Sequence, residues 1–448
     1  MTTDIRIADA SYEFEDHLYR SPIKFGGVAL DRATLLNVRV TVETRSGRTA
    51  EGFGSMPLAC TWAFPTRKHT YDETLAAMKE LAVAFWETVE EHTEFGHPIE
   101  LGHDLEPRFL AHLAPITAEL KLQDPIPVLA GLVAASPFDA AIHDAYGKAL
   151  GLNCFRTYGP EFLSTDLGHY LGKEFAGETL DRYVLPEPKP RMPLYHLIGA
   201  LDPLTPSEMK QPIGDGLPET LGDWIKRDGL THLKIKLNGD NLEWDIERVI
   251  AVNWVAEEVQ RHRGVNQWWY SLDFNERCPD VGYLLDFIRH LRERAPAAYD
   301  RVQYIEQPTA RDLKANRQNV MHEAAKYKPV VIDESLIDLE SLYLARDMGY
   351  TGVAFKACKG QTQSLLLAAA AQKMGLFRCV QDLTCVGASL IHSASLAAHI
   401  PGVAAIESNG RQYCPKANEL WENRFPGVFS IHDGTMNTAI LNGPGLGT

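Results

Sequence analysis

The chain has 448 residues, of which 45% are hydrophobic and 23% charged, a composition typical of a globular protein large enough for a barrel with an additional domain. The formal net charge of −15 argues against a nucleic-acid partner, because phosphate binding needs clustered basic surface. No apolar run in the sequence reaches the roughly 18 residues of a membrane span, and the N-terminal segment is acidic where a signal peptide would be basic. The cysteines are spread along the chain without CxxC spacing, which fits free thiols in a reducing compartment. We therefore expect a cytoplasmic protein without membrane contact.

The first part of the chain is predicted to be a small α+β unit. Residues 37–43 alternate apolar and polar side chains, which indicates a half-buried strand, and residues 48–53 can return beside it after the turn at Ser46-Gly47. Apolar residues at helical spacing predict a helix over about 72–89, and another helix is expected over 137–150, ended by Gly151. We place an N-terminal domain at residues 1–140.

From about Pro193 short apolar strands alternate with amphipathic helices. This alternation is typical of parallel βαβ units, and eight such strands favour a closed barrel over an open sheet. No GxGxxG or P-loop motif supports nucleotide binding. The barrel domain is predicted to span residues 141–409, with 410–448 packing back on the N-terminal domain. The extra segments at 95–135 and 160–192 have no assigned role. Strands are expected near 192–200, 231–237, 267–275, 301–308, 328–335, 351–357, 376–383 and 402–408.

Charged residues stand at the C-terminal ends of six of these successive strands, where a buried parallel strand should be apolar. One such residue alone fits a solvated strand end or a structural ion pair. The whole series at the same end indicates an active site at the barrel mouth, which is built from strand ends and the loops that follow them. The residues are Lys234, Lys236, Asp273, Glu306, Asp333, Glu334, Lys356 and Asp382.

The acidic members of the series predict a metal site. Carboxylates that converge from adjacent strands repel one another unless a cation lies between them. Oxygen ligands alone suit Mg²⁺, with Mn²⁺ as an alternative, and the scattered histidines do not indicate zinc.

The lysines, on the second and sixth barrel strands, are expected to face each other across the mouth. A lysine near a metal and a second ammonium group should have a lowered pKa and act as a base. A metal and two opposed bases are what enolisation of a carboxylate requires, because the enolate must be stabilised by concentrated positive charge.

These motifs resemble the enolase superfamily, specifically its muconate lactonizing enzyme subgroup within the mandelate racemase/muconate lactonizing enzyme group. The resemblance covers about 270 residues in matching order and implies a modified TIM barrel, (β/α)7β, with an N-terminal α+β capping domain. It rests on KIK at 234–236, DFN at 273–275, IEQP at 305–308, DES at 333–335, FKACKG at 355–360 and the segment PFDAAIHDAYGKALGLNCF at 137–155.

The resemblance also implies roles for individual residues. Asp273, Glu306 and Asp333 would bind Mg²⁺, and Lys236 and Lys356 would be the acid/base pair on opposite faces of the substrate. The residues expected to assist are Lys234, Asn275, Glu334 and Asp382, and Lys359 ranks below Lys356 as a base.

Substrate choice in such enzymes comes largely from capping-domain loops, here the segments Asp16 to Gly27 and Gly52 to Pro65. Arg20 and Lys24 are possible partners for a distal anion on the substrate, although both equally fit solvated loop charges. The sequence departs from the family pattern at Gly360-Gln361, where many members have two glycines.

We therefore expect an isomerase or lyase: a racemase, epimerase, cycloisomerase or dehydratase that abstracts a proton α to a carboxylate of a small molecule. The alternatives are a metal-dependent aldolase-type lyase with a Schiff-base lysine and a non-catalytic protein of the same fold. Barrels of this kind commonly form symmetric homo-oligomers, so we also expect one here.

Overall fold

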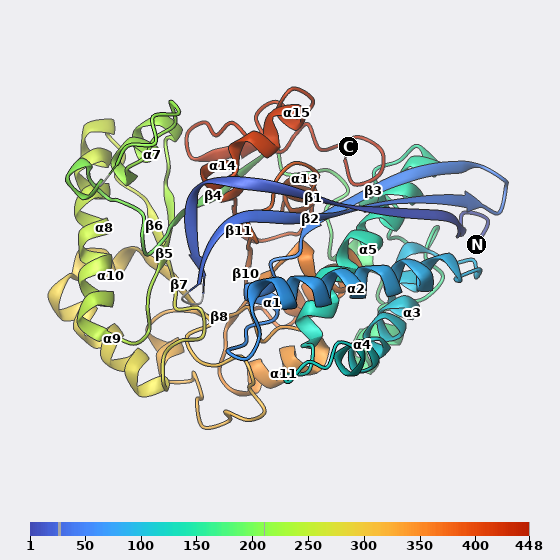
Figure 1. Cartoon of the computed structure of the whole chain (residues 1–448), viewed down its shortest axis with the longest axis horizontal. Coiled ribbons are helices and arrows are strands. Elements are labelled where there is room, and N and C mark those ends of the chain that lie inside the picture. The colour runs from blue at the N-terminus through green and yellow to red at the C-terminus, as the bar shows by residue number, and fades with distance from the viewer. Residues whose placement is uncertain (26–27, 210, 448) are drawn as a thin grey trace.

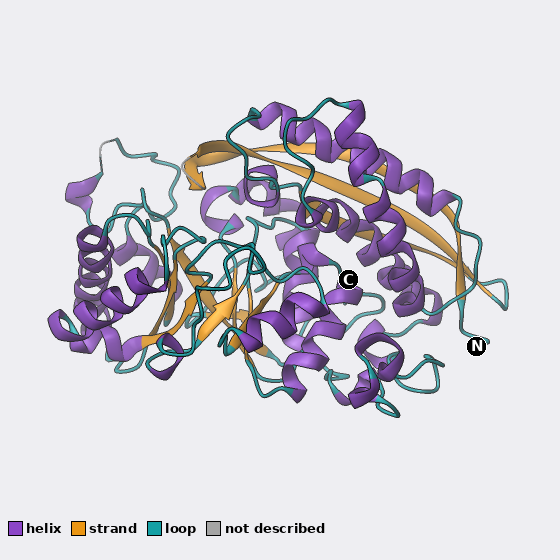
Figure 2. Ribbon diagram, turned by 90° about the horizontal axis from the view of Figure 1, so that it is seen from below, coloured by secondary structure: helices purple, strands orange, loops and turns teal. Residues whose placement is uncertain are grey.

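The computed structural model describes residues 1–25, 28–209 and 211–447, and within the hairpin it describes no side chains for residues 23–25, 28 and 29. The chain forms an N-terminal three-stranded sheet covered by helices, followed by a barrel of parallel strands (Figure 1). Figure 2 shows the barrel strands enclosed by helices, with the N-terminal sheet running across them as a separate layer.

The N-terminal sheet is antiparallel, in the order β1 (Ile5–Phe25), β2 (Val28–Thr44) and β3 (Thr49–Pro57). The predicted pair at 37–43 and 48–53 is confirmed within β2 and β3, whereas the long first strand was not predicted. Val38, Val40 and Val42 on one face of β2 are fully buried, as alternation requires.

Helices α2 (Tyr71–Glu90) and α5 (Val128–Leu150) pack on this sheet, and α3 (Pro98–Ala111) and α4 (Leu113–Glu119) pack against those two helices. Helix α5 packs directly on β3 because Gly54 has no side chain: a Cβ there would lie 1.8 Å from the carbonyl oxygen of Pro137. The boundary expected between residues 140 and 141 therefore lies inside a helix that packs on the N-terminal sheet.

The barrel has eight parallel strands in the order of the sequence, and pairing of the last with the first closes it. All eight predicted strands are confirmed. A short antiparallel strand, β12 (Thr435–Asn437), pairs with the first three residues of β4, before the point where β11 joins it. The barrel strands are β4 (Arg191–Ile198), β5 (His232–Lys236), β6 (Trp269–Asp273), β7 (Val302–Glu306), β8 (Val330–Ile332), β9 (Gly352–Phe355), β10 (Phe377–Val380) and β11 (Val403–Glu407).

Helices connect the strands and line the outside of the barrel. The helices of the barrel and the C-terminal segment are α6 (Leu167–Leu171), α7 (Leu221–Asp228), α8 (Leu242–Arg263), α9 (Val281–Arg294), α10 (Pro296–Arg301), α11 (Leu339–Asp347), α12 (Gln361–Lys373), α13 (Ala388–His399), α14 (Gly410–Tyr413) and α15 (Glu419–Glu422). A four-residue helix, α1 (Cys60–Ala63), precedes α2, and short 3-10 turns lie at 154–156, 173–175, 180–182, 206–208, 324–326, 357–359 and 415–418.

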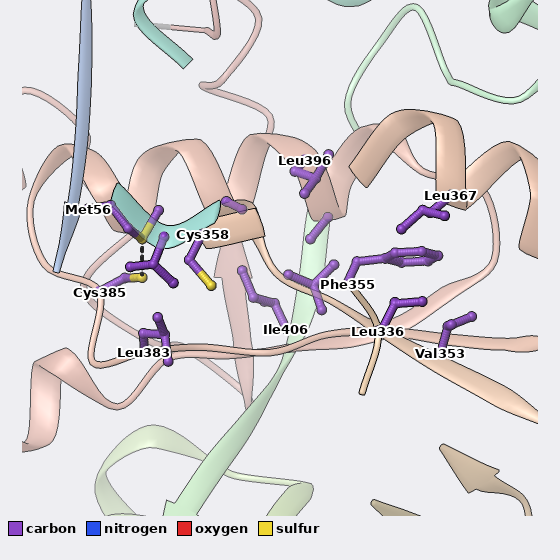
Figure 3. Packing of buried hydrophobic residues seen from close by; sticks show 14 of the residues in the cluster. Met56, Leu336, Val353, Phe355, Cys358, Leu367, Leu383, Cys385, Leu396 and Ile406 are labelled. Atoms are coloured by element: carbon purple, nitrogen blue, oxygen red, sulfur yellow. Dashed lines mark hydrogen bonds between the residues drawn. The ribbon is translucent and has the colours of Figure 1, made fainter. Parts of the chain in front are cut away.

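The N-terminal sheet packs on the barrel through buried contacts. Met56 of β3 lies against Cys385, which follows β10, with 3.7 Å between their sulfur atoms (Figure 3). The β1–β2 hairpin continues past this contact toward the barrel mouth, where Arg20 and Cys414 make contacts across the two parts. The C-terminal segment also bridges both parts, since the backbone NH of Leu446 donates to Asp144 of α5.

All seven cysteines are buried free thiols. Within the described ranges, none of the helices combines the length and hydrophobicity that crossing a bilayer needs.

Candidate active site

The charged side chains meet at one end of the barrel because the C-terminal residues of neighbouring strands are in register. Lys236 is in register with Asp273 of β6, which is in register with Glu306 of β7. Asp333 follows the last residue of β8, and Lys356 directly follows β9. Strands β5 and β9 are four positions apart in the closed eight-stranded order, so Lys236 and Lys356 rise from opposite sides of the barrel.

The turns after β6 and β7 hold these ends in an unusual backbone conformation. Asn275, Glu276 and Gln307 have φ values of 44°, 61° and 30°, a region that residues other than glycine seldom occupy. Gln307 is fixed by its side chain, whose Oε1 accepts the backbone NH of Asp333 and whose Nε2 donates to Ser335. This amide ties β7 to β8 and thereby sets Glu306 beside Asp333. Strain of this kind concentrates where side chains must be aimed.

Lys234 is the buried centre of the acidic residues. Its Nζ lies 3.1 Å from Asp273 Oδ2, 2.8 Å from Glu306 Oε1 and 3.0 Å from Glu407 Oε2. Burial alone would lower the pKa of this lysine, but the surrounding carboxylates outweigh burial and raise it well above its usual value. Lys234 is therefore a fixed ammonium group rather than a base.

Lys236 lies nearer the mouth of the barrel. Its Nζ forms an ion pair with Asp273 and donates to Asn275 Oδ1 at 2.8 Å. Burial opposes the charge of Asp273, but the Lys236 and Lys234 ammonium groups prevail and lower the pKa of that carboxyl. Asn275 in turn donates to Glu334 Oε1 at 3.2 Å.

Asp333 faces two lysines on the other side. Lys356 Nζ lies 2.9 Å from Asp333 Oδ2, and Lys359 Nζ donates to the Asp333 carbonyl oxygen at 2.6 Å. Burial would lower the pKa of Lys356, but the neighbouring Asp333 carboxylate outweighs burial and raises it, and the lowered pKa expected beside a bound metal stays a prediction. Lys359 behaves in the opposite way, because burial dominates and lowers its pKa.

Trp62 of α1 brings the N-terminal unit into the site. Its ring centroid lies 4.1 Å from Lys356 Nζ, and its Nε1 donates to Glu334 Oε1 at 2.9 Å. Burial, followed by the charges of Asp333 and Glu276, raises the pKa of Glu334 to about 7. Arg311 holds the Trp62 carbonyl oxygen at 3.0 Å and pairs with Glu276.

The carboxylates fit a hard divalent cation. Asp273 and Glu306 both approach one ammonium group, Lys234, and the second oxygen of Glu306 is buried without a hydrogen-bond partner in the described part of the chain. Burial and the neighbouring Asp273 carboxylate raise the pKa of Glu306 well above its usual value, the sign of negative charge crowded into a small space. Oxygen donors with this crowding suit Mg²⁺. The described residues contain no group of three or more His, Cys, Asp or Glu side chains already spaced as a metal centre; lysine ammonium groups lie between these acids.

The remaining predicted residues lie apart from this centre or brace it. Asp382 Oδ1 accepts the backbone NH of Cys385, and its Oδ2 accepts that of Asn409, so this carboxylate joins the loops after β10 and β11. Burial, followed by the charge of Glu407, raises its pKa to about 6. Arg20 instead forms a two-pronged ion pair with Asp215, at 2.6 and 2.7 Å. The side chain of Lys24 lies outside the described residues.

Three residues of the site were not predicted. Glu407 ends β11 in the same way that Glu306 ends β7, so the pattern of charged strand ends could have identified it. Gln381, which accepts from Lys234 at 2.8 Å, carries no charge and gave no signal. Trp62 lies in the segment expected to govern substrate choice, but the sequence does not indicate which of its residues faces the barrel.

The family described as enolase C-terminal domain-like matches residues 217–448, slightly more than half of the chain. No curated protein matches the sequence.

Solved structures with the same fold match over nearly the whole chain. The dipeptide epimerase of Enterococcus faecalis V583, complexed with Mg and the dipeptide L-Leu-L-Tyr, is 16% identical with a TM-score of 0.64, and the match covers 99% of both chains. The muconate lactonizing enzyme of Pseudomonas fluorescens, complexed with muconolactone, is 16% identical with a TM-score of 0.61 and covers 99% of this chain and 96% of its own. The L-Ala-D/L-Glu epimerase of Bacillus subtilis is 15% identical with a TM-score of 0.61 and covers 98% of both. At these identities the likeness establishes the fold alone, a barrel of parallel strands with an N-terminal capping domain, whereas the match to the family model shows that the chain belongs to the enolase C-terminal domain-like family.

Proposed function

Because this chain belongs to the enolase C-terminal domain-like family, we propose that it is an enolase-superfamily enzyme that removes the proton α to the carboxylate of a small molecule. We further propose that epimerisation or racemisation at that carbon is the outcome. The observation that carries the proposal is the position of Lys236 and Lys356 on opposite barrel strands, each paired with an acid of the same buried cluster.

Asp273, Glu306 and Asp333 would hold Mg²⁺, as their crowding and the unpartnered oxygen of Glu306 support. When bound, the ion supplies positive charge that stabilises the enolate formed from the substrate carboxylate. Lys234 keeps Asp273 and Glu306 at fixed positions through its ammonium group, and it takes no part in proton transfer.

The proton moves between two amines. The neutral Nζ of one lysine accepts the α-proton, and the electron pair of the C–H bond passes into the enolate of the substrate. The ammonium group of the other lysine then donates a proton to the same carbon from the opposite face, so that the configuration is inverted. Lys356 is 4% exposed and the side chain of Lys236 is 12% exposed, so little water can reach either amine and compete for these protons.

The solved structures of similar fold include two epimerases, which supports the proposed outcome, and a muconate lactonizing enzyme, which makes cycloisomerisation the second candidate. A dehydratase would use the same first step. Homo-oligomer formation stays a prediction.

The test is exchange of the α-proton in D₂O with Mg²⁺ present. Single enantiomers of acid sugars, dipeptides and N-acyl amino acids are incubated with the enzyme and followed by NMR and chiral chromatography. Deuterium at the α-carbon together with the opposite configuration is expected for at least one class. Exchange without inversion would favour cycloisomerisation or elimination. Borohydride trapping of a substrate–lysine adduct would contradict the enolate mechanism in favour of the Schiff-base lyase.

A further inference from the structure

A cavity of about 730 Å³ opens beside the reaction centre, at the C-terminal end of β4. Its walls are the β1 segment at Ser21 and Pro22, the long connection between β4 and α7, and Gln412 with Tyr413 of α14. The volume falls within the roughly 300–1,000 Å³ of typical small-molecule sites. Among the predicted site residues only Arg20 lines it, so the metal-ligand and lysine cluster does not account for this space.

The cavity adjoins the reaction centre on the side of Lys236. Leu197, which lines the cavity, is in register with Lys234 of β5, so the two side chains lie on the same face of the barrel wall, as does Lys236 two residues further on. Neighbouring strands are about 4.8 Å apart, so the cavity begins one strand away from the strand that carries this lysine. On the other side of β4, β11 ends at Glu407, which binds Lys234.

Most of the lining is hydrocarbon. Two residues of the cavity lining, Leu201 and Ile213, are 61% and 42% exposed. Exposed large apolar side chains that line a cavity indicate a site for an apolar ligand. Trp224 and Tyr413 add aromatic surface that is suited to apolar groups. The other apolar residues of the lining are Pro22, Leu197, Ile198, Pro203, Met209, Pro212 and Leu221.

The charged groups of the lining already have partners within the wall. Arg20 is held by both oxygens of Asp215, and Asp202 accepts from Tyr413 at 2.5 Å and from the backbone NH of Gly199 at 2.8 Å. Glu219 accepts the backbone NH of Ile213 at 2.9 Å. An additional anion would have to displace Asp215 from Arg20 and approach these carboxylates, both of which oppose its binding.

We infer that this cavity binds the part of the substrate remote from the reacting carboxylate, and that this part is an uncharged alkyl or aryl group. The inference rests on the proposed function, because it takes the carboxylate head to lie between Lys236 and Lys356. This inference replaces the expectation, drawn from the sequence, that Arg20 binds an anionic group at the distal end of the substrate. The enzyme is therefore assigned to carboxylates with a hydrocarbon tail.

Binding of linear acids to the Mg²⁺-loaded full chain tests this assignment by calorimetry. Butanoate, hexanoate and octanoate share the carboxylate and differ in tail length, and adipate and suberate match the two longer acids but end in a second carboxylate. We expect the dissociation constant to fall about 15-fold for each two carbons added, because each buried methylene strengthens binding about fourfold. The diacids should bind at least tenfold more weakly than the monoacids of the same length.

Two substitutions test whether the hydrocarbon tail of the bound acid lies in this cavity. Leu201→Asp places a charge in the cavity wall at an exposed position, so it should abolish the dependence of the dissociation constant on tail length. Leu420→Asp is the matched control, since Leu420 is 83% exposed and lies outside the cavity lining.

The assignment is overturned if octanoate binds no more tightly than butanoate, if suberate binds more tightly than octanoate, or if Leu201→Asp keeps the dependence on tail length. Exchange of α-protons in D₂O separates this result from the proposed function. If the enzyme exchanges α-protons but binds hydrocarbon-tailed acids no better than others, only the cavity assignment is wrong. If binding depends on tail length but no carboxylate exchanges its α-proton, only the proposed chemistry is wrong.

Discussion

The indole of Trp62 stands between two groups of the barrel, with its ring 4.1 Å from Lys356 Nζ and its Nε1 bonded to Glu334 at 2.9 Å. Glu334 also accepts from Asn275, which accepts from Lys236. A residue of the capping unit thus completes a chain of contacts between the two lysines.

The ring face of Trp62 should stabilise the ammonium form of Lys356. In Trp62→Leu the pKa of Lys356 is expected to fall by about one unit, because a desolvated cation–π contact is worth roughly 1–2 kcal/mol and one pKa unit corresponds to about 1.4 kcal/mol. The basic limb of the pH profile for α-proton exchange should move to lower pH by the same amount. Trp62→Phe retains the ring and loses only the bond to Glu334, so its profile should stay near that of the wild type. Equal shifts in both variants would assign the effect to the Glu334 bond instead.

Removal of either proposed base should stop turnover without unfolding the protein. Lys236→Ala and Lys356→Ala are each expected to lower the exchange rate by roughly 10²–10⁴-fold, the usual contribution of a general base. Lys326→Ala, which removes an exposed lysine paired only with Glu323, serves as the control and should exchange at the wild-type rate. Full activity in either base variant, measured by NMR, would refute its assignment.

Mg²⁺ should stabilise the folded chain through the three acids. Binding to the native state alone adds about 2.7 kcal/mol at a hundredfold excess over the dissociation constant, so the thermal midpoint should rise when Mg²⁺ is added. Glu306→Gln retains the size of the side chain but loses its charge, and it is expected to abolish the rise. Glu340→Gln, at an exposed ion pair with Lys314, should leave the rise intact. An unchanged response in Glu306→Gln would exclude Glu306 as a ligand.

The Lys234 ammonium group forms ion pairs with three buried carboxylates, so its removal should destabilise the folded protein. Lys234→Met has a similar length but no charge, and we expect it to lower the free energy of unfolding by about 3–5 kcal/mol in urea titrations at neutral pH. The loss should shrink at acidic pH, where the uncompensated acids can take up protons. A neutral effect at pH 7 would mean that the acids share protons instead of relying on this ammonium group.

Glu106 makes stability depend on pH at the contact between α3 and the barrel. Burial and the neighbouring Asp139 raise its pKa from 4.5 to about 7. The folded state therefore holds a proton that the unfolded chain releases, and stability should fall as the pH rises from about 4.5 to about 7. At about 1.4 kcal/mol for each pKa unit, the fall amounts to about 3 kcal/mol. Glu106→Gln should flatten this part of the profile in urea titrations, whereas a profile as steep as the wild type would locate the titration elsewhere, for example at Asp139.

The fold was predictable because its signals are local. Each barrel strand is a short apolar run followed by a helical pattern, and the charged residue at its end shows which end forms the mouth. The family and the capped barrel expected from these patterns are confirmed. The roles of the lysines and acids stay predictions, although the structure brings them within contact of one another.

What escaped prediction depends on partners distant in the sequence. Arg20 looked available for a ligand because Asp215, its partner, lies 195 positions away. The raised pKa of Lys356 likewise follows from its contact with Asp333, whose position is set by how β8 and β9 end. The long β1 strand was missed because its charged side chains interrupt any apolar pattern.

The docking of the segment from Arg20 to Trp62 on the barrel also determines when the site can form during synthesis. Trp62 reaches Glu334 across 272 positions, Met56 reaches Cys385 across 329, and Arg20 reaches the carbonyl of Gln412 across 392. The N-terminal sheet leaves the ribosome before the barrel does, so its residues must wait for these partners to be translated. Contacts of such long range form slowly, so the nascent protein can gain a working site only after its final barrel strands have closed.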